Sequence, residues 1–599
     1  MKLIKYIGFG LFAVAGFSSC SDWLDVNDNP NSPTNTVAAV AARLPWIQHH
    51  YGYAHGVASF RGSFITGQVT SRSGYASTSA YEYMSIWAPA QGMATTPYQH
   101  WFVGAGCNID DLITKAKEEG AYHYIGAAKV LHAMGFMLMA DWYGECPYTE
   151  ALGPVLNPKY DDGKTIFYGC LNELDEALSY FGMTQDVGAT PLAKGDNWNG
   201  GDLSKWVALV HGLKARWLNN LSKKSFYDPQ AILAEINLGP TSNALSTVIN
   251  HENDPADLTG DVLTGDPLKT SFIFDSGAWS DHIRATKFYT DMFEYEQPDG
   301  TMLYDPRREK MLPANQHWNA DGTSYFMVTK GADVIHSDLK LLNGPQIQSY
   351  DTKTRTYKCS TPARAADTVY VTFKGVCAMQ GATSGDGTYF AADGTILSTG
   401  SFYTRPESPS HYMTYYEMCF IKAEVLFRQG DKAGALAAYK AGIKSHFEMM
   451  NDKLNEYAGT TNPGKMPMDE TEISNFLNSD AICQNAASLT MAEIMKQKYI
   501  AMSFSQQNWN DMRRFNYSAG NIGDFGVVYP NFDRPRAMPV DATATIMPGA
   551  SKTDDNYWWR RSMHCSHETN YNLKQLEASN PKALSKDIWS VPVWWDTVE

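Results

Sequence analysis

The clearest fold signal lies in residues 140–151, which read Ala140-Asp141-Trp142-Tyr143-Gly144-Glu145-Cys146-Pro147-Tyr148-Thr149-Glu150-Ala151. Before this segment, apolar or small side chains recur at three- and four-residue steps, the period of a helix with one apolar face. They are Tyr124, Ala128, Leu131, Gly135 and Leu138. Gly144 suits the left-handed backbone that commonly ends a helix, and Pro147 lies just beyond it. The segment therefore predicts a long helix that ends at Trp142–Gly144.

Helical patterns of the same kind follow this segment. One carries Ile166, Cys170, Leu174, Ala177 and Phe181, and another, starting near Asp202, carries Trp206, Val210, Leu213, Trp217 and Leu221. Four tryptophans fall on apolar helical stripes and are expected in the core: Trp101, Trp142, Trp206 and Trp509. Short turns between helices of this length favour antiparallel pairs.

Helices return at residue 412. Tyr412, Tyr416, Cys419, Ala423 and Leu426 form one stripe that stops at Gln429-Gly430, and Asp431 can cap the next helix. This pair matches part of the tetratricopeptide pattern of about 34 residues. Further on, Thr490 and Glu493 have the spacing of a capping box, which opens a helix that reaches Arg513-Arg514.

Residues 239–409 are dense in Gly, Asp, Ser and Thr, and they show little helical periodicity. Thr368–Phe373 reads as a strand, one helical piece is expected around Ile283–Tyr295, and turns are signalled by Asp299-Gly300, Asp321-Gly322 and Asp393-Gly394. We expect a mainly α protein with one domain over 37–599. Its parts are a helical frame over about 37–238 and 410–515, a loop-rich, partly β insert over about 239–409, and a loop-rich C-terminal part over 516–599. Long loops on a rigid frame are where binding residues tend to lie.

The N-terminus has the anatomy of an export signal. Lys2 and Lys5 precede an apolar run over Ile7–Phe17 that is too short to span a bilayer, and small residues lead into Cys20. We expect a signal peptide over 1–19, lipidation of Cys20, and a tether over 20–36, where Asn, Asp, Pro and Ser leave no apolar face. The alternative is an ordinary signal peptide that is cut nearby, with Cys20 incidental.

Composition narrows the class of protein. The chain has 599 residues, with 49 Lys and Arg against 64 Asp and Glu, and the net charge of −15 argues against a nucleic-acid partner. Its nine cysteines include no Cys-x-x-Cys pair, so their spacing indicates neither a zinc site nor a dithiol redox motif. Cys359 and Cys377 could bridge a hairpin, whereas Cys107, Cys170 and Cys419 sit in helical patterns and are expected to be buried.

Several stretches together resemble the SusD/RagB family of Bacteroidetes outer-membrane lipoproteins, especially its second SusD-like branch. Residues 140–151 look like the family signature D-x-Y-G-D-x-P-Y-x-E-A, with Glu145 where Asp is commoner. The other stretches, in chain order, are Cys20 with Asn29-Pro30-Asn31-Ser32-Pro33-Thr34, Gly201-Asp202-x-x-Lys205-Trp206, Asp305-Pro306-Arg307, Tyr415–Gly430, Ile494–Arg514 and Val593-Trp594-Trp595-Asp596. They cover nearly the whole chain, although the final third has fewer of the expected Pro and Asn positions.

The resemblance implies a SusD-like fold, in which tetratricopeptide-type helix pairs form the frame. It also implies a nutrient-binding lipoprotein on the outside of the cell outer membrane, held there only by its lipid anchor. Such a protein acts as the lid of a SusC-like TonB-dependent importer and captures a glycan or, in some branches of the family, a peptide. The resemblance implies no catalysed reaction and no cofactor.

An enzyme would need a catalytic motif, and the sequence shows none of the established ones. A glycoside hydrolase needs two carboxylates that flank a cleft, whereas adjacent pairs such as Asp110-Asp111 and Asp161-Asp162 diverge on a helix. His49-His50 with His55, and His564-Cys565-x-His567, match no established metal-site spacing, so we expect no metal. A surface glycoside hydrolase and a purely structural helical-repeat adaptor are the alternative hypotheses.

The binding hypothesis rests on aromatic residues in the expected loops, because the flat face of a sugar ring rests well on Trp or Tyr. Two clusters resemble, by their position in the chain, the regions that supply sugar-stacking residues in the family. They are Arg72, Tyr75, Tyr81, Tyr83 and Trp87, and then Trp279, Asp281, Trp318 and Tyr325. The alternative for each aromatic residue is that it packs its loop onto the frame.

Overall fold

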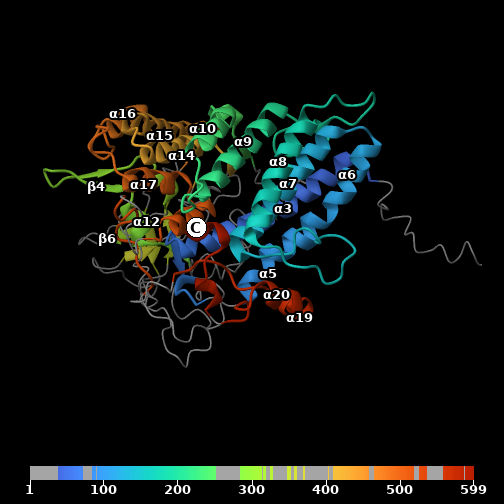
Figure 1. Ribbon diagram of the computed structural model, residues 1–599. Coiled ribbons are helices and arrows are strands. Elements are labelled where there is room, and N and C mark those ends of the chain that lie inside the picture. Colours follow the sequence, from blue (N-terminus) through green and yellow to red (C-terminus); the bar gives the residue numbers. More distant parts are fainter. Residues whose placement is uncertain are drawn as a thin grey trace, which may run out of the picture.

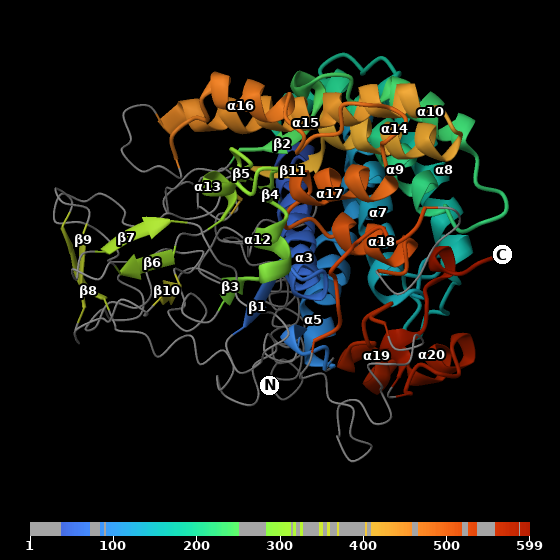
Figure 2. The same cartoon turned by 90° about the vertical axis from the view of Figure 1, so that its left-hand side faces the viewer.

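The computed structural model describes residues 38–71, 84–88, 91–250, 283–312, 315–318, 324–327, 347–351, 356–359, 368–370, 402–403, 409–457, 465–517, 525–535, 558–585 and 587–599. Helices dominate these residues, and most of the short strands gather on one side of the helices (Figure 1, Figure 2). The prediction of a mainly α protein with a partly β elaboration is confirmed. The predicted signal peptide, Cys20 and the tether lie outside the described residues.

The N-terminal half of the frame is a row of helices (Figure 1). The first is α3 (Val40–Ile65), followed by α5 (Gly92–Gln99), a π-helix η1 (His100–Ala105), a 3-10 turn η2 (Gly106–Asn108) and α6 (Ile109–Glu118). Then come α7 (Tyr122–Tyr143), α8 (Gly163–Phe181), η3 (Leu192–Lys194), α9 (Leu203–Asn220), α10 (Pro229–Leu238) and η4 (Asn243–Leu245). The predicted end of α7 is confirmed, because Gly144 follows Tyr143 with a φ of 84°.

The C-terminal half pairs α14 (Tyr415–Arg428) with α15 (Lys432–Leu454), which continues into η7 (Asn455–Tyr457). Beside them lie α16 (Glu470–Leu477), α17 (Met491–Ala501) and α18 (Gln507–Arg514), and the chain goes on to α19 (Ser566–Tyr571), α20 (Leu573–Ser579), η8 (Ile588–Ser590) and η9 (Trp594–Asp596). The predicted caps are present: the Asp431 carboxylate accepts a hydrogen bond from Gly434 N at 2.8 Å. Thr490 and Glu493 form both hydrogen bonds of the capping box.

The strands form small antiparallel sheets. Their bounds are β1 (Val69–Ser71), β2 (Thr247–Ile249), β3 (Ile283–Ala285), β4 (Glu294–Glu296), β5 (Met302–Tyr304), β6 (Asn315–Trp318), β7 (Ser324–Met327), β8 (Ile347–Asp351), β9 (Thr356–Cys359), β10 (Thr368–Tyr370) and β11 (Ser410–Met413). β1 pairs with β3, β2 with β11, β4 with β5 and β8 with β9, while β6 lies between β10 and β7. The short helix α13 (Arg308–Met311) follows β5.

A helical piece lies within Ile283–Tyr295, as expected, but it is short, because strands occupy both ends of this range. Only α12 (Lys287–Asp291) is helical, and β3 and β4 flank it. The Thr286 hydroxyl caps α12 by accepting a hydrogen bond from Tyr289 N at 3.0 Å. The residues before Thr286 pair with β1 instead of extending this helix, because strand pairing with a distant segment overrides the local helical pattern.

The buried carboxylate of Asp141 forms hydrogen bonds with residues from distant stretches of the chain. Asp141 lies near the end of α7 and is 5% exposed. Its carboxylate accepts hydrogen bonds from Gln506 Nε2 at 3.1 Å and from Asn510 Nδ2 at 2.7 Å. It also accepts one from Trp595 Nε1 at 2.9 Å, and Arg513 Nη1 donates to the Asp141 carbonyl at 2.7 Å. The stretches 140–151, 494–514 and 593–596, separate in the sequence, therefore meet at one point.

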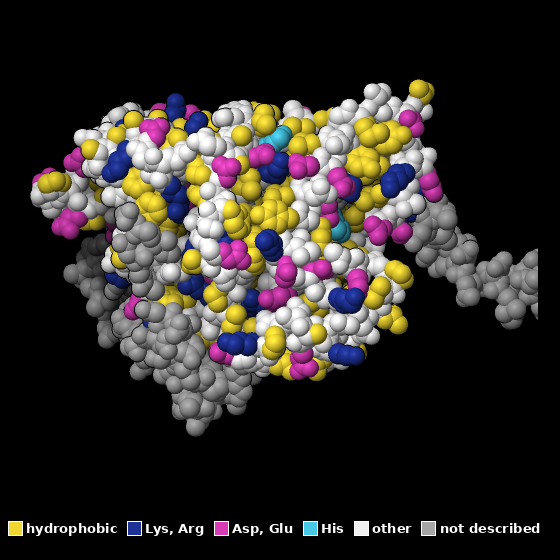
Figure 3. All heavy atoms as spheres, viewed as in Figure 1, with side chains coloured by type: hydrophobic (Ala, Val, Ile, Leu, Met, Phe, Trp, Pro, Cys, Tyr) yellow, Lys and Arg dark blue, Asp and Glu magenta, His cyan; other side chains and the backbone are white. Residues whose placement is uncertain are grey.

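The four tryptophans expected in the core are each 1% exposed or less: Trp101, Trp142, Trp206 and Trp509. None of the helices in the described residues combines the length and the apolar character that crossing a bilayer requires. On the face shown in Figure 3, acidic and basic side chains are interspersed and do not gather into a large basic field. That distribution agrees with the acidic net charge of the chain.

The cysteine expectations are confirmed in part. Cys170 and Cys419 are buried, as expected. Cys107 is exposed, so the expectation of burial is wrong for it. It lies in η2, at the surface between the π-helix and α6, where its thiol donates to the Val103 carbonyl at 2.8 Å. The suggested bridge from Cys359 involves Cys377, which lies outside the described residues.

Candidate ligand-binding face

The structure describes part of the predicted ligand-binding set. Trp87 lies in a described segment, and Trp318 and Tyr325 belong to β6 and β7. The other members lie outside the described residues: Arg72, Tyr75, Tyr81, Tyr83, Trp279 and Asp281. The segments that carry them join the helical frame at β1, β3 and Trp87, which are described. We call the surface around these three features the candidate ligand-binding face.

β1 and β3 join the two segments that carry the predicted residues. The pairing is antiparallel, and Ser71, the last residue of β1, lies opposite Ile283, the first residue of β3. Arg72 follows Ser71 directly in the chain, and Asp281 lies two positions before Ile283. Paired strands lie about 5 Å apart, so the first segment leaves the frame where the second one enters it. Figure 2 shows β1 and β3 together beside α3.

Hydrogen bonds and packing hold the base of this ladder to the frame. α3 leads into a turn at Gly67, whose φ of 76° suits glycine, and a Cβ there would lie 3.0 Å from the Phe532 ring. Thr286 N donates to the Gln68 carbonyl at 3.1 Å. Phe504 N, in the turn between α17 and α18, donates to the Gln68 side chain at 2.9 Å. The first segment therefore leaves the frame, and the second one returns to it, next to residues that contact both halves of the frame.

Trp87 lies in the core and not in an accessible loop. Its side chain is 1% exposed, and its ring centroid lies 5.6 Å from that of Tyr517, 5.9 Å from Trp558 and 6.3 Å from Phe532. Tyr517 stacks on Trp558 at an interplanar angle of 18° and on Phe532 at 17°. The expectation that Trp87 presents a free ring to a sugar is therefore corrected, since other aromatic rings pack around it. Trp87 instead fixes the chain to the frame just after residues 72–83.

Trp318 and Tyr325 lie on neighbouring strands. In the antiparallel β6·β7 pair, Trp318 lies opposite Ser324 and Tyr325 lies opposite His317. The two predicted residues are therefore one ladder position apart. Figure 2 shows this sheet on the same side of α3 as β1 and β3. The contribution of Trp318 and Tyr325 to ligand binding stays a prediction.

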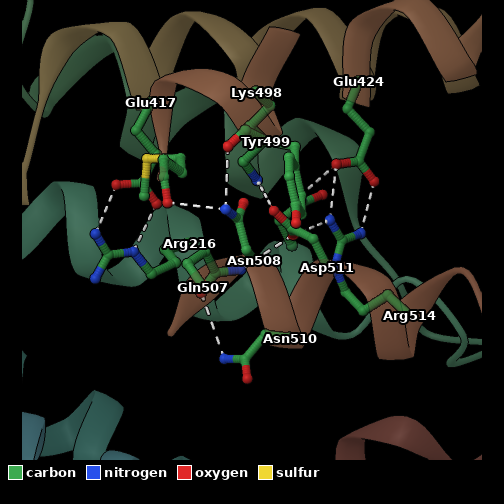
Figure 4. Close-up of polar contacts among 12 residues, drawn as sticks. Arg216, Glu417, Glu424, Lys498, Tyr499, Gln507, Asn508, Asn510, Asp511 and Arg514 are labelled. Atoms are coloured by element: carbon green, nitrogen blue, oxygen red, sulfur yellow. Dashed lines mark hydrogen bonds and ion pairs between the residues drawn. The ribbon is translucent and has the colours of Figure 1, made fainter. Parts of the chain in front are cut away.

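A network of buried charges joins α14, α17 and α18 (Figure 4). Glu424 accepts hydrogen bonds from both terminal nitrogens of Arg514, at 2.6 and 2.9 Å. Arg514 also donates to Asp511 Oδ1 at 2.6 Å, and the Lys498 ammonium lies 2.8 Å from Asp511 Oδ2. All four side chains are 1% exposed or less. The network therefore links three helices through charges that compensate one another in the interior.

The neighbouring arginines govern the titration of Glu424. Burial by itself raises the pKa of a carboxyl group, but Arg514 and Arg428 outweigh it and hold the pKa of Glu424 well below its usual range. Arg428, on the same helix, donates to Glu424 Oε1 at 2.9 Å. Glu424 therefore stays ionised near neutral pH. This behaviour suits a structural support and not a group that exchanges protons in a reaction.

Two of the histidines singled out in the sequence, His50 and His564, pack among other side chains, whereas His567 is exposed. His50 Nδ1 lies 3.0 Å from His100 Nδ1, and burial, with the nearby His49 and His100, lowers the pKa of His50 to about 4. Burial, with the nearby Arg561, also lowers the pKa of His564 to about 4. In the part of the chain that the structure describes, no group of three or more His, Cys, Asp or Glu side chains could hold a metal ion.

The sequence predicted the candidate segments, but it did not predict the residues whose hydrogen bonds hold β1 and β3 to the frame. Gln68 and Thr286 are fully buried, although both are polar and neither belongs to a recognisable motif. The one usable signal is Gly67, which follows an apolar helix and precedes the β-branched residues Val69 and Thr70. That pattern marks a turn from a helix into a strand, but it does not identify the partner strand.

Comparison with known proteins settles the family. A family model described as "Starch-binding associating with outer membrane" matches residues 65–520. The chain belongs to the SusD-like family. The predicted family resemblance is thereby confirmed, and the SusD-like family is one of binding proteins associated with the outer membrane.

Solved SusD-like structures align with nearly the whole chain. A SusD/RagB family protein from Bacteroides thetaiotaomicron is 16% identical, with a TM-score of 0.59 over 94% of this chain and 100% of the other. A chitin-binding protein is 18% identical, with a TM-score of 0.58 over 93% and 100%. A SusD homologue from Bacteroides fragilis is 16% identical, with a TM-score of 0.55 over 94% and 100%. At these identities the likeness shows the shared SusD-like fold. No curated protein matches the chain.

Proposed function

We propose that this protein captures a glycan on the outside of the cell outer membrane, as the lipid-anchored lid of a SusC-like TonB-dependent importer. The observation that carries the proposal is the β1·β3 pairing, which joins the segment that contains Tyr75, Tyr81 and Tyr83 to the segment that contains Trp279 and Asp281. The family description, which names starch binding, and a structural neighbour described as chitin-binding support a glycan ligand. The role requires capture and release, and no reaction.

Weak binding is sufficient for this role. A dissociation constant of 1 mM corresponds to about −4 kcal/mol, which a few stacked rings and hydrogen bonds can supply. A lid held over a pore keeps its ligand at a high effective concentration there. Very tight binding would slow the transfer of the nutrient into the importer.

A glycan panel tests the proposal directly. The chain from residue 21 onward is titrated by calorimetry with malto-oligosaccharides and chito-oligosaccharides, and at least one series is expected to bind. Tyr75→Ala and Trp279→Ala should each weaken that binding about fivefold or more, because each removes a stacking ring. Tyr571→Ala is the matched control, since Tyr571 is 77% exposed and lies on α19, outside the candidate face.

The outcomes separate the alternatives. Binding of peptides with no binding of any glycan would replace the glycan proposal with the peptide branch of the family. Shortening of the glycans, abolished by one Asp or Glu substitution, would establish a hydrolase instead. Co-purification with a SusC-like transporter tests the lid role, and binding to the transporter without any nutrient would favour an adaptor.

A further inference from the structure

A second concave site lies away from the candidate ligand-binding face. It is a surface cleft of about 270 Å³ between α5, the π-helix η1, α19 and the loop that follows α7. The apolar residues that line it are Phe102, Val103, Pro147, Ala151, Leu152 and Pro158. Val103 is 67% exposed, so the cleft is open to solvent. The site therefore offers apolar walls to a ligand that arrives from outside.

Side-chain hydrogen bonds build the cleft from distant parts of the chain. Asn157 Nδ2, in the loop after α7, donates to the Tyr571 carbonyl of α19 at 2.8 Å. Asn572 Nδ2 donates back to the Pro158 carbonyl at 3.0 Å. These bonds hold the loop against α19, so the shape of the cleft does not depend on a bound ligand.

Glu568 of α19 supplies the carboxylate of the cleft. Tyr98 OH donates to Glu568 Oε1 at 2.6 Å, and Tyr160 OH donates to Oε2. Burial, together with the charge of Glu568, raises the pKa of Tyr98 well above its usual value, so this phenol keeps its proton. The two phenols orient the carboxylate, but they are neutral donors and do not compensate its charge.

Among the described residues Glu568 forms no salt bridge; besides the two phenols, Asn572 Nδ2 donates to its Oε2 at 3.4 Å, and His567 also lines the cleft. Arg561, in the segment before α19, is paired with Glu145 at 2.5 Å. His564 is buried and neutral near pH 7, because burial lowers its pKa to about 4. A partly buried carboxylate gains most from an opposite charge when it lies next to apolar surface, where solvent screens the attraction less.

We propose that this cleft binds a lysine side chain of a polypeptide, with its ammonium group on Glu568 and its methylene stem along the apolar wall. Lysine combines a compact cation with a four-carbon stem, which matches one carboxylate at the side of an apolar cleft. An amino sugar carries the same ammonium group, but the apolar wall gives its hydroxyls few partners. This second site is independent of the proposed glycan site.

Calorimetry with small probes tests the proposal. The probes are Nα-acetyl-lysine N-methylamide and the same compound acetylated on Nε, which removes the charge and keeps the stem. The full chain from residue 21 onward should bind the charged probe about tenfold more tightly than the acetylated one, as expected for a charge-assisted hydrogen bond. Glucosamine, as the arm for amino sugars, should bind more weakly than the lysine probe.

Variants assign the effect to the cleft. Glu568→Gln should abolish the preference for the charged probe, whereas Glu577→Gln, an exposed carboxylate change on the neighbouring α20, should leave it intact. Val103→Ser removes part of the apolar wall and should weaken both probes, and it keeps the test valid if Glu568→Gln fails to fold. Equal binding of the two probes to the unmodified chain would overturn the proposal. A preference that persists in Glu568→Gln, or tighter binding of glucosamine, would overturn it as well.

Discussion

Among single residues, Glu424 is expected to have a large effect on stability. Glu424→Gln removes a buried negative charge and leaves Arg514 and Arg428 with one charged partner fewer each. We expect the free energy of unfolding to fall by about 3–5 kcal/mol, because uncompensated charge in the interior is costly. Chemical denaturation measures this value. The matched control is Glu448→Gln on α15, whose side chain is 54% exposed, and its effect should stay below about 0.5 kcal/mol.

The same residue predicts how stability depends on pH. The pKa of Glu424 is lower in the folded chain than in the unfolded chain, where a glutamate titrates near about 4.3. Its stabilising contribution is therefore fully present above that value and is lost as the pH falls towards the folded pKa. The difference in unfolding free energy between the unmodified chain and Glu424→Gln should shrink between pH 7 and pH 3. A difference that stays constant or grows over this range would contradict the assignment.

Among elements, the turn from α3 into β1 positions the strand from which the first predicted binding segment leaves the frame. Gly67→Val should lower the free energy of unfolding by about 1–3 kcal/mol, because a β-branched residue is strained at positive φ. The added Cβ would also lie 3.0 Å from the Phe532 ring. Thermal unfolding measures the loss, and glycan affinity should fall with it although Gly67 is not itself a predicted ligand contact. Gly92→Ala is the control, because a Cβ there meets nothing within 4 Å.

The elements that the sequence predicted well are those set by nearby residues. Asp431 and Thr490 cap the helices they were expected to cap, and a helix starts at Asp202 as expected, because a cap acts within one turn. Around Ile283–Tyr295 the helical piece was predicted but the strand β3 before it was not, since that strand forms only by pairing with β1, far earlier in the chain. Local patterns carry no information about such a partner.

The candidate site was only partly predictable for the same reason. The aromatic composition of residues 72–87 predicts a binding segment, but the burial of Trp87 depends on Tyr517 and Trp558, which the local sequence does not contain. Likewise, Glu424 looks like an ordinary helical glutamate until Arg514 of a distant helix is placed beside it. Contacts with distant parts of the chain decide which aromatic residue of a segment is free to contact a ligand and which one packs into the core.

For the whole molecule, the proposed arrangement separates attachment from recognition. Cys20→Ala should release the protein from the membrane into the soluble fraction, because the lipid anchor is its only proposed hold on the bilayer. The released protein should bind glycans with unchanged affinity, which calorimetry checks against the lipidated form in detergent. Membrane retention of the variant in cells that lack the proposed transporter would contradict lipidation at Cys20, and loss of binding would contradict the separation of the two roles.

The β1·β3 ladder consists of three residue pairs, and at one end of it the first predicted binding segment begins and the second one ends. If these segments bind the ligand as proposed, mutations in them alter ligand choice without disturbing the contacts that hold α14, α17 and α18 together. Such a layout lets selection act on recognition while the folding of the frame stays unaffected. It also suggests a practical use: residues 72–83 and 251–282, exchanged as two separate segments between relatives, would carry their ligand preference into a frame that already folds.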